Sequence, residues 1–136
     1  MKRLKIMCAA SIAMSGMVSC LFVYSFLTHS RVRRELPWFA TDIRECYNSA
    51  GFRDDYSIEL RARINAADFD SYADRLGLNK TCSSHFGPVD MDWHSCSEAW
   101  WTPPDSLKGA RYARGDDWAA LAKYDVGYVY VQYSKW

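Results

Sequence analysis

The N-terminal part of the chain lacks acidic residues, and most of it lacks charge altogether. Both absences bear on where the protein is located in the cell. The first 34 residues contain six Lys and Arg but no acidic residue, and the 23 residues from Ile6 to Thr28 carry no charge at all. At about 1.5 Å per residue, a helix of that length spans roughly 30–35 Å, which is enough to cross the hydrocarbon core of a bilayer. We therefore predict an N-terminal transmembrane helix within residues 1–34 and a small soluble domain in residues 35–136.

Two other uses of the N-terminal segment stay open. The basic start followed by an apolar run is also typical of a cleaved signal peptide. The four residues from Met17 to Cys20 resemble a bacterial lipobox with Cys20 as the lipidated residue, although Met17 stands where Leu is usual. Three basic residues flank each end of the apolar run, so the positive-inside rule does not decide the orientation. We favour an uncleaved single-pass anchor with the body outside the cytoplasm, either periplasmic or extracellular.

The body of the protein has few basic residues and no known catalytic motif. From Glu35 onward it holds 11 Lys and Arg against 16 acids, a net charge of −5. Binding of nucleic acid through phosphates needs a basic face, so we exclude that class of partner. The sequence also contains no nucleophile elbow, HExxH, P-loop or paired-glycine phosphate motif. We therefore predict no cofactor and favour a non-enzymatic role.

The middle of the chain has the clearest secondary-structure signals. Apolar and polar residues alternate from Tyr56 to Ile64, which predicts a strand with one buried and one solvated face. The apolar spacing then becomes helical, with Asn65 placed to cap an amphipathic helix and Gly77 placed to end it.

Weaker patterns complete the fold prediction. Apolar residues between Pro37 and Gly51 have helical spacing and predict a short helix. The last third contains three runs rich in aromatic and β-branched residues between Gly/Asp turns, which predict strands. The whole is typical of an α+β domain, with an antiparallel sheet of about four strands packed against one or two helices.

The segment TCSSHFGPVDMDWHSC, from Thr81 to Cys96, contains most of the residues that could carry chemistry. A disulfide between Cys82 and Cys96 would close a short loop and add on the order of 3 kcal/mol to stability. A bridge from Cys46 to either of them is equally allowed by the sequence. The remaining interpretation is that Cys46, Cys82 and Cys96 are all reduced and lie in the core.

Metal binding and catalysis are the other interpretations of this segment. The possible metal ligands have an uncommon spacing, so we do not favour a zinc site; they are Cys82, His85, His94 and Cys96. A hydrolytic centre would need a cysteine nucleophile next to a histidine base that a third group orients. Its candidate residues are Cys82, His85, Asp92, His94 and Cys96.

Aromatic side chains are the candidates for a contact surface. Trp93, Trp100 and Trp101 are expected either to pack over an open end of the core or to contact a partner or a sugar ring. Tyr128 and Tyr130 lie on one face of a predicted strand and would face outward if the opposite valine face packs on the helix.

These observations lead us to expect a membrane-tethered extracytoplasmic protein-interaction module, such as an accessory subunit or an inhibitor or immunity-type protein. The alternatives are a small metal-binding or hydrolytic domain centred on the Cys82–Cys96 loop, or a carbohydrate- or cell-wall-binding domain that uses exposed tryptophans.

Overall fold

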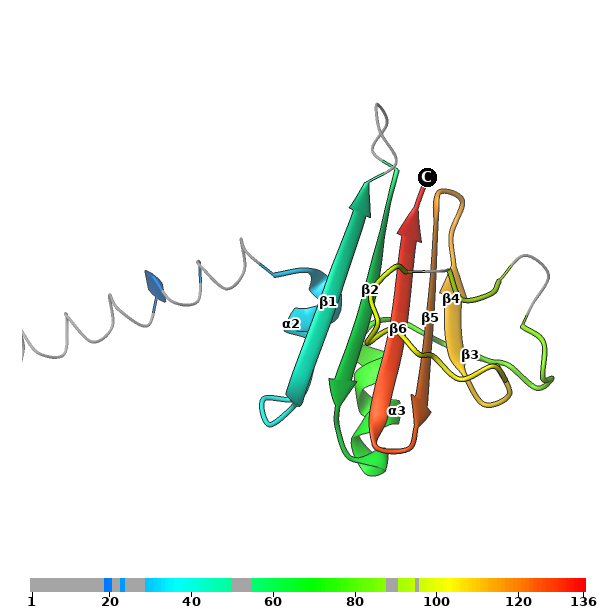
Figure 1. Cartoon of the computed structure of the whole chain (residues 1–136), viewed down its shortest axis with the longest axis horizontal. Coiled ribbons are helices and arrows are strands. Elements are labelled where there is room, and N and C mark those ends of the chain that lie inside the picture. The colour runs from blue at the N-terminus through cyan, green and yellow to red at the C-terminus, as the bar shows by residue number, and fades with distance from the viewer. Residues whose placement is uncertain (1–18, 21–22, 24–28, 50–54, 88–90, 95) are drawn as a thin grey trace, which may run out of the picture. The chain divides into compact units, whose positions relative to one another are not determined.

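Six strands form one antiparallel sheet in the described part of the chain (Figure 1). The computed structural model describes residues 19–20, 23, 29–49, 55–87, 91–94 and 96–136. The strand order is β1-β2-β6-β5-β4-β3. The strands are β1 (Thr41–Ser49), β2 (Tyr56–Arg63), β3 (Lys80–Thr81), β4 (Arg111–Arg114), β5 (Trp118–Asp125) and β6 (Tyr128–Lys135). The α+β class is therefore confirmed, with six strands where about four were predicted.

The chain divides into two compact units, Met1–Arg34 and Glu35–Trp136. The short helix α2 (Arg31–Arg34) belongs to the first unit. Apart from Ser19, Cys20 and Val23, the predicted anchor Ile6–Thr28 lies outside the described residues. Among the helices that the structure describes, none is both long and apolar enough to cross a membrane.

The predicted strand and helix in the middle of the chain are both present. On β2, Leu60 and Ala62 are fully buried. Helix α3 (Ala66–Arg75) packs on the same face of the sheet, where the ring of Phe69 lies 6.3 Å from that of Tyr124 on β5. Gly77 has a φ of +80°, a conformation that glycine adopts without strain, and it follows the end of α3 as predicted.

The cap of α3 differs from its prediction in one detail. Asn65 occupies the N-cap position, but its side chain makes no capping hydrogen bond. Its backbone carbonyl instead accepts a hydrogen bond of 3.1 Å from the amide of Asp68. The first turn is therefore closed by the main chain alone.

The prediction of a short helix between Pro37 and Gly51 is wrong, because this segment forms the edge strand β1. Backbone pairing with β2 determines its structure, in a regular register from Arg44 to Ser49. Asp42 has a φ of +45° within an irregularity between Thr41 and Arg44, as in a β-bulge. An edge strand buries few side chains, so β1 lacks the alternation that identified β2.

The second face of the sheet is covered too, which corrects the prediction of a solvated face on β2. Residues 82–110, the covering segment, contain no helix or strand among their described residues and cross the sheet opposite α3 (Figure 1). Beneath them, Glu59, Gln132 and Ser134 are buried. A polar face has thus become an interior, and its side chains must find partners there.

The backbone of the covering segment supplies many of those partners. The amide of His94 donates to Oε1 of Gln132, whose Nε2 donates to the Asp92 carbonyl at 3.2 Å. Arg61 donates to the Trp100 carbonyl at 3.0 Å. The ammonium group of Lys123 similarly donates to the carbonyls of Ser106 and Lys108. Side chains of the sheet thus anchor the covering segment, in addition to the hydrogen bonds within the segment itself.

Candidate functional site

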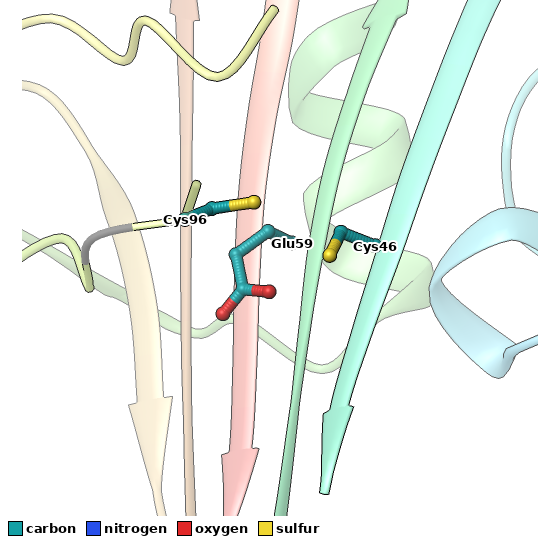
Figure 2. Close-up of side chains that lie close together, drawn as sticks. All are labelled: Cys46, Glu59 and Cys96. Atoms are coloured by element: carbon teal, nitrogen blue, oxygen red, sulfur yellow. The ribbon is translucent and has the colours of Figure 1, made fainter. Parts of the chain in front are cut away.

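The site is built on one row of residues that crosses the sheet. Cys46 on β1 lies opposite Glu59 on β2, and Glu59 lies opposite Gln132 on β6. Directly opposed residues project from the same face of a sheet, so the thiol and the carboxylate are neighbours. Cys96, from the covering segment, approaches them from above that face (Figure 2). One sulfur or oxygen donor atom from each of the three residues lies within 4.8 Å of the others. We call Cys46, Glu59 and Cys96 the thiol–carboxylate cluster.

Glu59 is the most constrained member of the cluster. Its side chain is fully buried, at 0% exposure. Oε2 accepts a hydrogen bond of 2.9 Å from Nδ2 of Asn48, whereas Oε1 has no hydrogen-bond partner. No ion pair to Glu59 occurs among the described residues. Burying a carboxylate without a full set of partners is unfavourable, so the protein alone leaves this group incompletely satisfied.

The Cys46 thiol is neutral at physiological pH. Its pKa is raised from 9.0 to about 11, first by burial, then by the hydrogen bond with Cys96, and then by the charges of Cys96, Glu59 and Glu98. Sγ also contacts Oδ1 of Asn48 at 3.8 Å. A reactive cysteine needs a lowered pKa, because the thiolate is the nucleophile. The cluster is therefore not built to activate Cys46 for attack.

Cys82, one of the two possible partners of Cys96 in the sequence, lies in a different part of the structure. It is 4% exposed and packs in a core cluster with Leu107, Ala110 and Leu121. Burial raises the pKa of its thiol. The described cysteines are all free, namely Cys20, Cys46, Cys82 and Cys96. Of the pairs that the sequence allowed, the structure brings together Cys46 and Cys96.

The predicted histidine ligands are not assembled around Cys82 and Cys96. His85 is exposed, with its ring 5.4 Å from that of Phe86. Nδ1 of His94 lies 3.4 Å from the hydroxyl of Ser134. Within the described ranges, the thiol–carboxylate cluster is the one group of three or more possible ligands at metal-binding distances. The carboxylate of Asp92 is used locally, since it accepts a hydrogen bond from the amide of Trp93.

The predicted contact aromatics mostly hold the covering segment in place. Trp101 is 8% exposed and Tyr130 is 7% exposed, with their rings 5.9 Å apart. Trp93 and Trp100 are half-buried, with their rings 5.7 and 5.9 Å from that of Trp101. Tyr128 is also half-buried, and its hydroxyl donates to Asp42 at 3.1 Å. These five side chains therefore form part of the domain's own packing.

Sequence reasoning missed two features that the structure shows. Exposed aromatic side chains lie next to or within β1, with Trp38 94% exposed and Tyr47 62% exposed. The adjacent pair Trp38–Phe39 was visible in the sequence, but its exposure was not. Glu59 was also missed, because a glutamate in an alternating strand normally faces solvent.

Comparison of the chain with protein-family models, with curated proteins and with solved structures gave no match. The class of the protein is therefore described by its structure alone. It is an α+β domain with an exposed edge strand and a buried thiol–carboxylate cluster.

Proposed function

We propose that this chain is a membrane-tethered extracytoplasmic protein-binding module that recognises its partner through the edge of β1. The observation that carries the proposal is the position of this nine-residue strand. It pairs with β2 on one side, and in the described part of the chain no strand covers its other side. An uncovered edge exposes backbone donors and acceptors that a strand of another protein can pair with.

The side chains around β1 support this role. The ring of Trp38 lies 5.6 Å from that of Phe39, and both side chains are exposed immediately before the strand. Within the strand, exposed Tyr47 stacks on Tyr56 with ring centroids 5.4 Å apart. Aromatic residues are enriched in protein interfaces and among the residues that contribute most to affinity. Backbone pairing would supply general affinity, and these side chains would supply selectivity.

The bulge at the beginning of β1 limits the part of the strand that is available for pairing with another protein. Natural edge strands are often protected by charges or bulges, and Asp42 provides such an irregularity at the beginning of β1. The regular segment from Arg44 to Ser49 is the part of β1 with which a partner strand would pair.

The N-terminal apolar run would make a second contribution to binding, because a tether raises the local concentration of partners in the same membrane. The net charge of −5 on the body suits a partner with a basic surface.

Carbohydrate binding through Trp93, Trp100 and Trp101 is less well supported. A sugar ring needs an accessible aromatic face, and Trp101 is buried against Tyr130. The indole N–H of Trp93 is also used, as it donates to the Pro104 carbonyl at 2.9 Å.

Site-specific photocrosslinking in the native membrane tests the proposal. A photoreactive amino acid replaces Tyr47 in the full-length chain, and the matched control replaces Val126, which is 87% exposed in the turn between β5 and β6. We expect one protein to be crosslinked from position 47 and not from position 126. Equal crosslinking from both positions, or none from position 47, would contradict a β1 interface.

Hydrogen exchange on the purified complex then tests the mode of binding. Strand pairing should slow exchange of the outward-facing amides between Arg44 and Ser49, while the amides of the central strand β6 should change little. A complex that forms without added protection in β1 would rule out strand pairing as the mode of recognition.

A further inference from the structure

We propose that Cys46, Glu59 and Cys96 bind a single divalent, thiophilic metal ion, with Zn²⁺ as the expected occupant. The proposal is independent of the β1 interface. Two thiolates and one carboxylate are donors that zinc accepts, and one position remains for water or another ligand. The donor atoms lie within 4.8 Å of one another, close enough for all three side chains to converge on one ion.

The buried carboxylate is the second, independent observation. Oε1 of Glu59 has no hydrogen-bond partner although the side chain is 0% exposed. Oε2 is held by Nδ2 of Asn48, so one oxygen fixes the carboxylate, and one carboxylate oxygen lies within 4.8 Å of both sulfurs. A cation bound to Oε1 would supply the missing interaction and offset the cost of burying the charge.

Asn48 is placed to orient the Glu59 carboxylate toward an ion. It lies two residues after Cys46 on β1, on the same face, and its amide group bonds Glu59 directly. Groups that orient a metal-bound carboxylate or histidine in this way affect affinity without touching the ion. We assign Asn48 as a positioning residue for Glu59.

The ligands come from three separate segments, which indicates what the ion would do. Cys46 lies on edge strand β1, Glu59 on β2, and Cys96 on the covering segment. An ion bound by all three would connect the edge strand to the covering segment. We therefore infer a structural site, in which binding free energy adds to folding stability.

Cobalt substitution tests the site in the full-length, detergent-solubilised chain, kept reduced with a phosphine. Co²⁺ bound by thiolates has a charge-transfer absorption that aqueous Co²⁺ lacks. We expect one Co²⁺ per chain, displaced by Zn²⁺ and confirmed by native mass spectrometry. The band should be lost in Cys46→Ser and in Cys96→Ser. Cys82→Ala is the matched control and should keep it, as should a variant with Cys8 and Cys20 both changed to Ser.

Two gentler variants keep the test decisive if removal of a ligand cysteine unfolds the chain. Glu59→Gln keeps the shape of the side chain and should weaken Co²⁺ binding by at least about 10-fold, because the ionised ligand is lost. Asn48→Ala changes an exposed residue and should weaken binding about 10-fold, with an unchanged circular dichroism spectrum.

Three results would overturn the proposal. One is a reduced, folded wild-type chain that shows no thiolate–cobalt band. Another is a band that disappears as completely in Cys82→Ala as in Cys96→Ser. The last is a Cys46–Cys96 disulfide in the chain isolated from its native membrane, because oxidised sulfurs cannot be the ligands.

Discussion

Cys46 lies directly opposite Glu59 in the pairing of β1 with β2, and this register places a neutral thiol next to a fully buried carboxylate. The charge of Glu59 contributes to the raised pKa of Cys46. A change at Glu59 should therefore be measurable at Cys46.

In the absence of metal, Glu59→Gln should stabilise the reduced protein. The substitution removes a buried charge, and the new carboxamide oxygen can still accept the hydrogen bond from Asn48, while its NH2 group takes the place of the unpartnered Oε1 and offsets part of the gain. We expect a gain of about 1 kcal/mol or more in the free energy of unfolding, measured by urea titration in the presence of a chelator. Glu98→Gln, at an exposed position, is the control and should change stability by less than about 0.5 kcal/mol. A lower urea midpoint for Glu59→Gln than for the wild type would contradict this expectation, because it would mean that the charge of Glu59 stabilises the folded protein.

Alkylation of Cys46 should be slow near neutral pH and should accelerate as the pH approaches about 11, the pKa of its thiol in the folded protein. Mass spectrometry of the peptide that contains Cys46 measures the rate in metal-free protein. In urea the inflection should return toward the ordinary value of 9.0. It should also fall in Glu59→Gln, because the carboxylate charge is one of its causes. The same inflection in folded and unfolded protein would contradict this account.

Stability should decrease in alkaline solution, in part through Tyr72. Burial first, and then the charge of Glu45, raise the pKa of this fully buried tyrosine well above 10.0. The unfolded chain then loses the phenolic proton at a pH where the folded chain keeps it, so stability falls as the pH rises above about 10. One such group contributes a slope of at most about 1.4 kcal/mol per pH unit. Urea titrations between pH 9 and pH 11 should give a shallower decline for Tyr72→Phe; equal slopes would exclude Tyr72 as a cause.

Two tryptophan substitutions should separate packing from surface exposure. Trp101→Ala removes a side chain that packs on Tyr130 and donates from its indole to the His94 carbonyl at 3.0 Å. We expect a loss of about 3–5 kcal/mol, which in a domain this small gives extensive unfolding. Trp38→Ala removes an indole that is 94% exposed and should change stability by less than about 0.5 kcal/mol. Similar losses for both variants, measured by thermal unfolding, would contradict the assigned roles.

Sequence patterns predicted the elements whose burial follows a simple period. The alternation in β2 and the apolar stripe of α3 are both produced by one buried face, and both elements occur where expected. The prediction failed for β1 because this strand has no buried face with a simple period. Its side chains are mostly exposed, so the spacing of Ile43, Cys46 and Tyr47 reflects no buried helical face. Pairing with β2 decided its structure, and such long-range pairing leaves little trace in local sequence.

The candidate site was only partly predictable. The sequence singled out Cys96 but allowed its pairing with Cys46 and with Cys82 equally. Packing of Cys82 with Leu107 and Leu121 separates it from the cluster. Glu59 could not be found from sequence, because its burial depends on the covering segment, which has no periodic pattern of its own.

The way in which the covering segment is held has a consequence for the order of folding. Besides hydrogen bonds within the segment, several of its backbone groups are bonded by Gln132 on β6, Arg61 on β2 and Lys123 on β5. These side chains line one surface only after the three strands have paired. We therefore expect the sheet to assemble first and the covering segment to become ordered last, since closing distant contacts costs chain entropy that only the assembled sheet can offset.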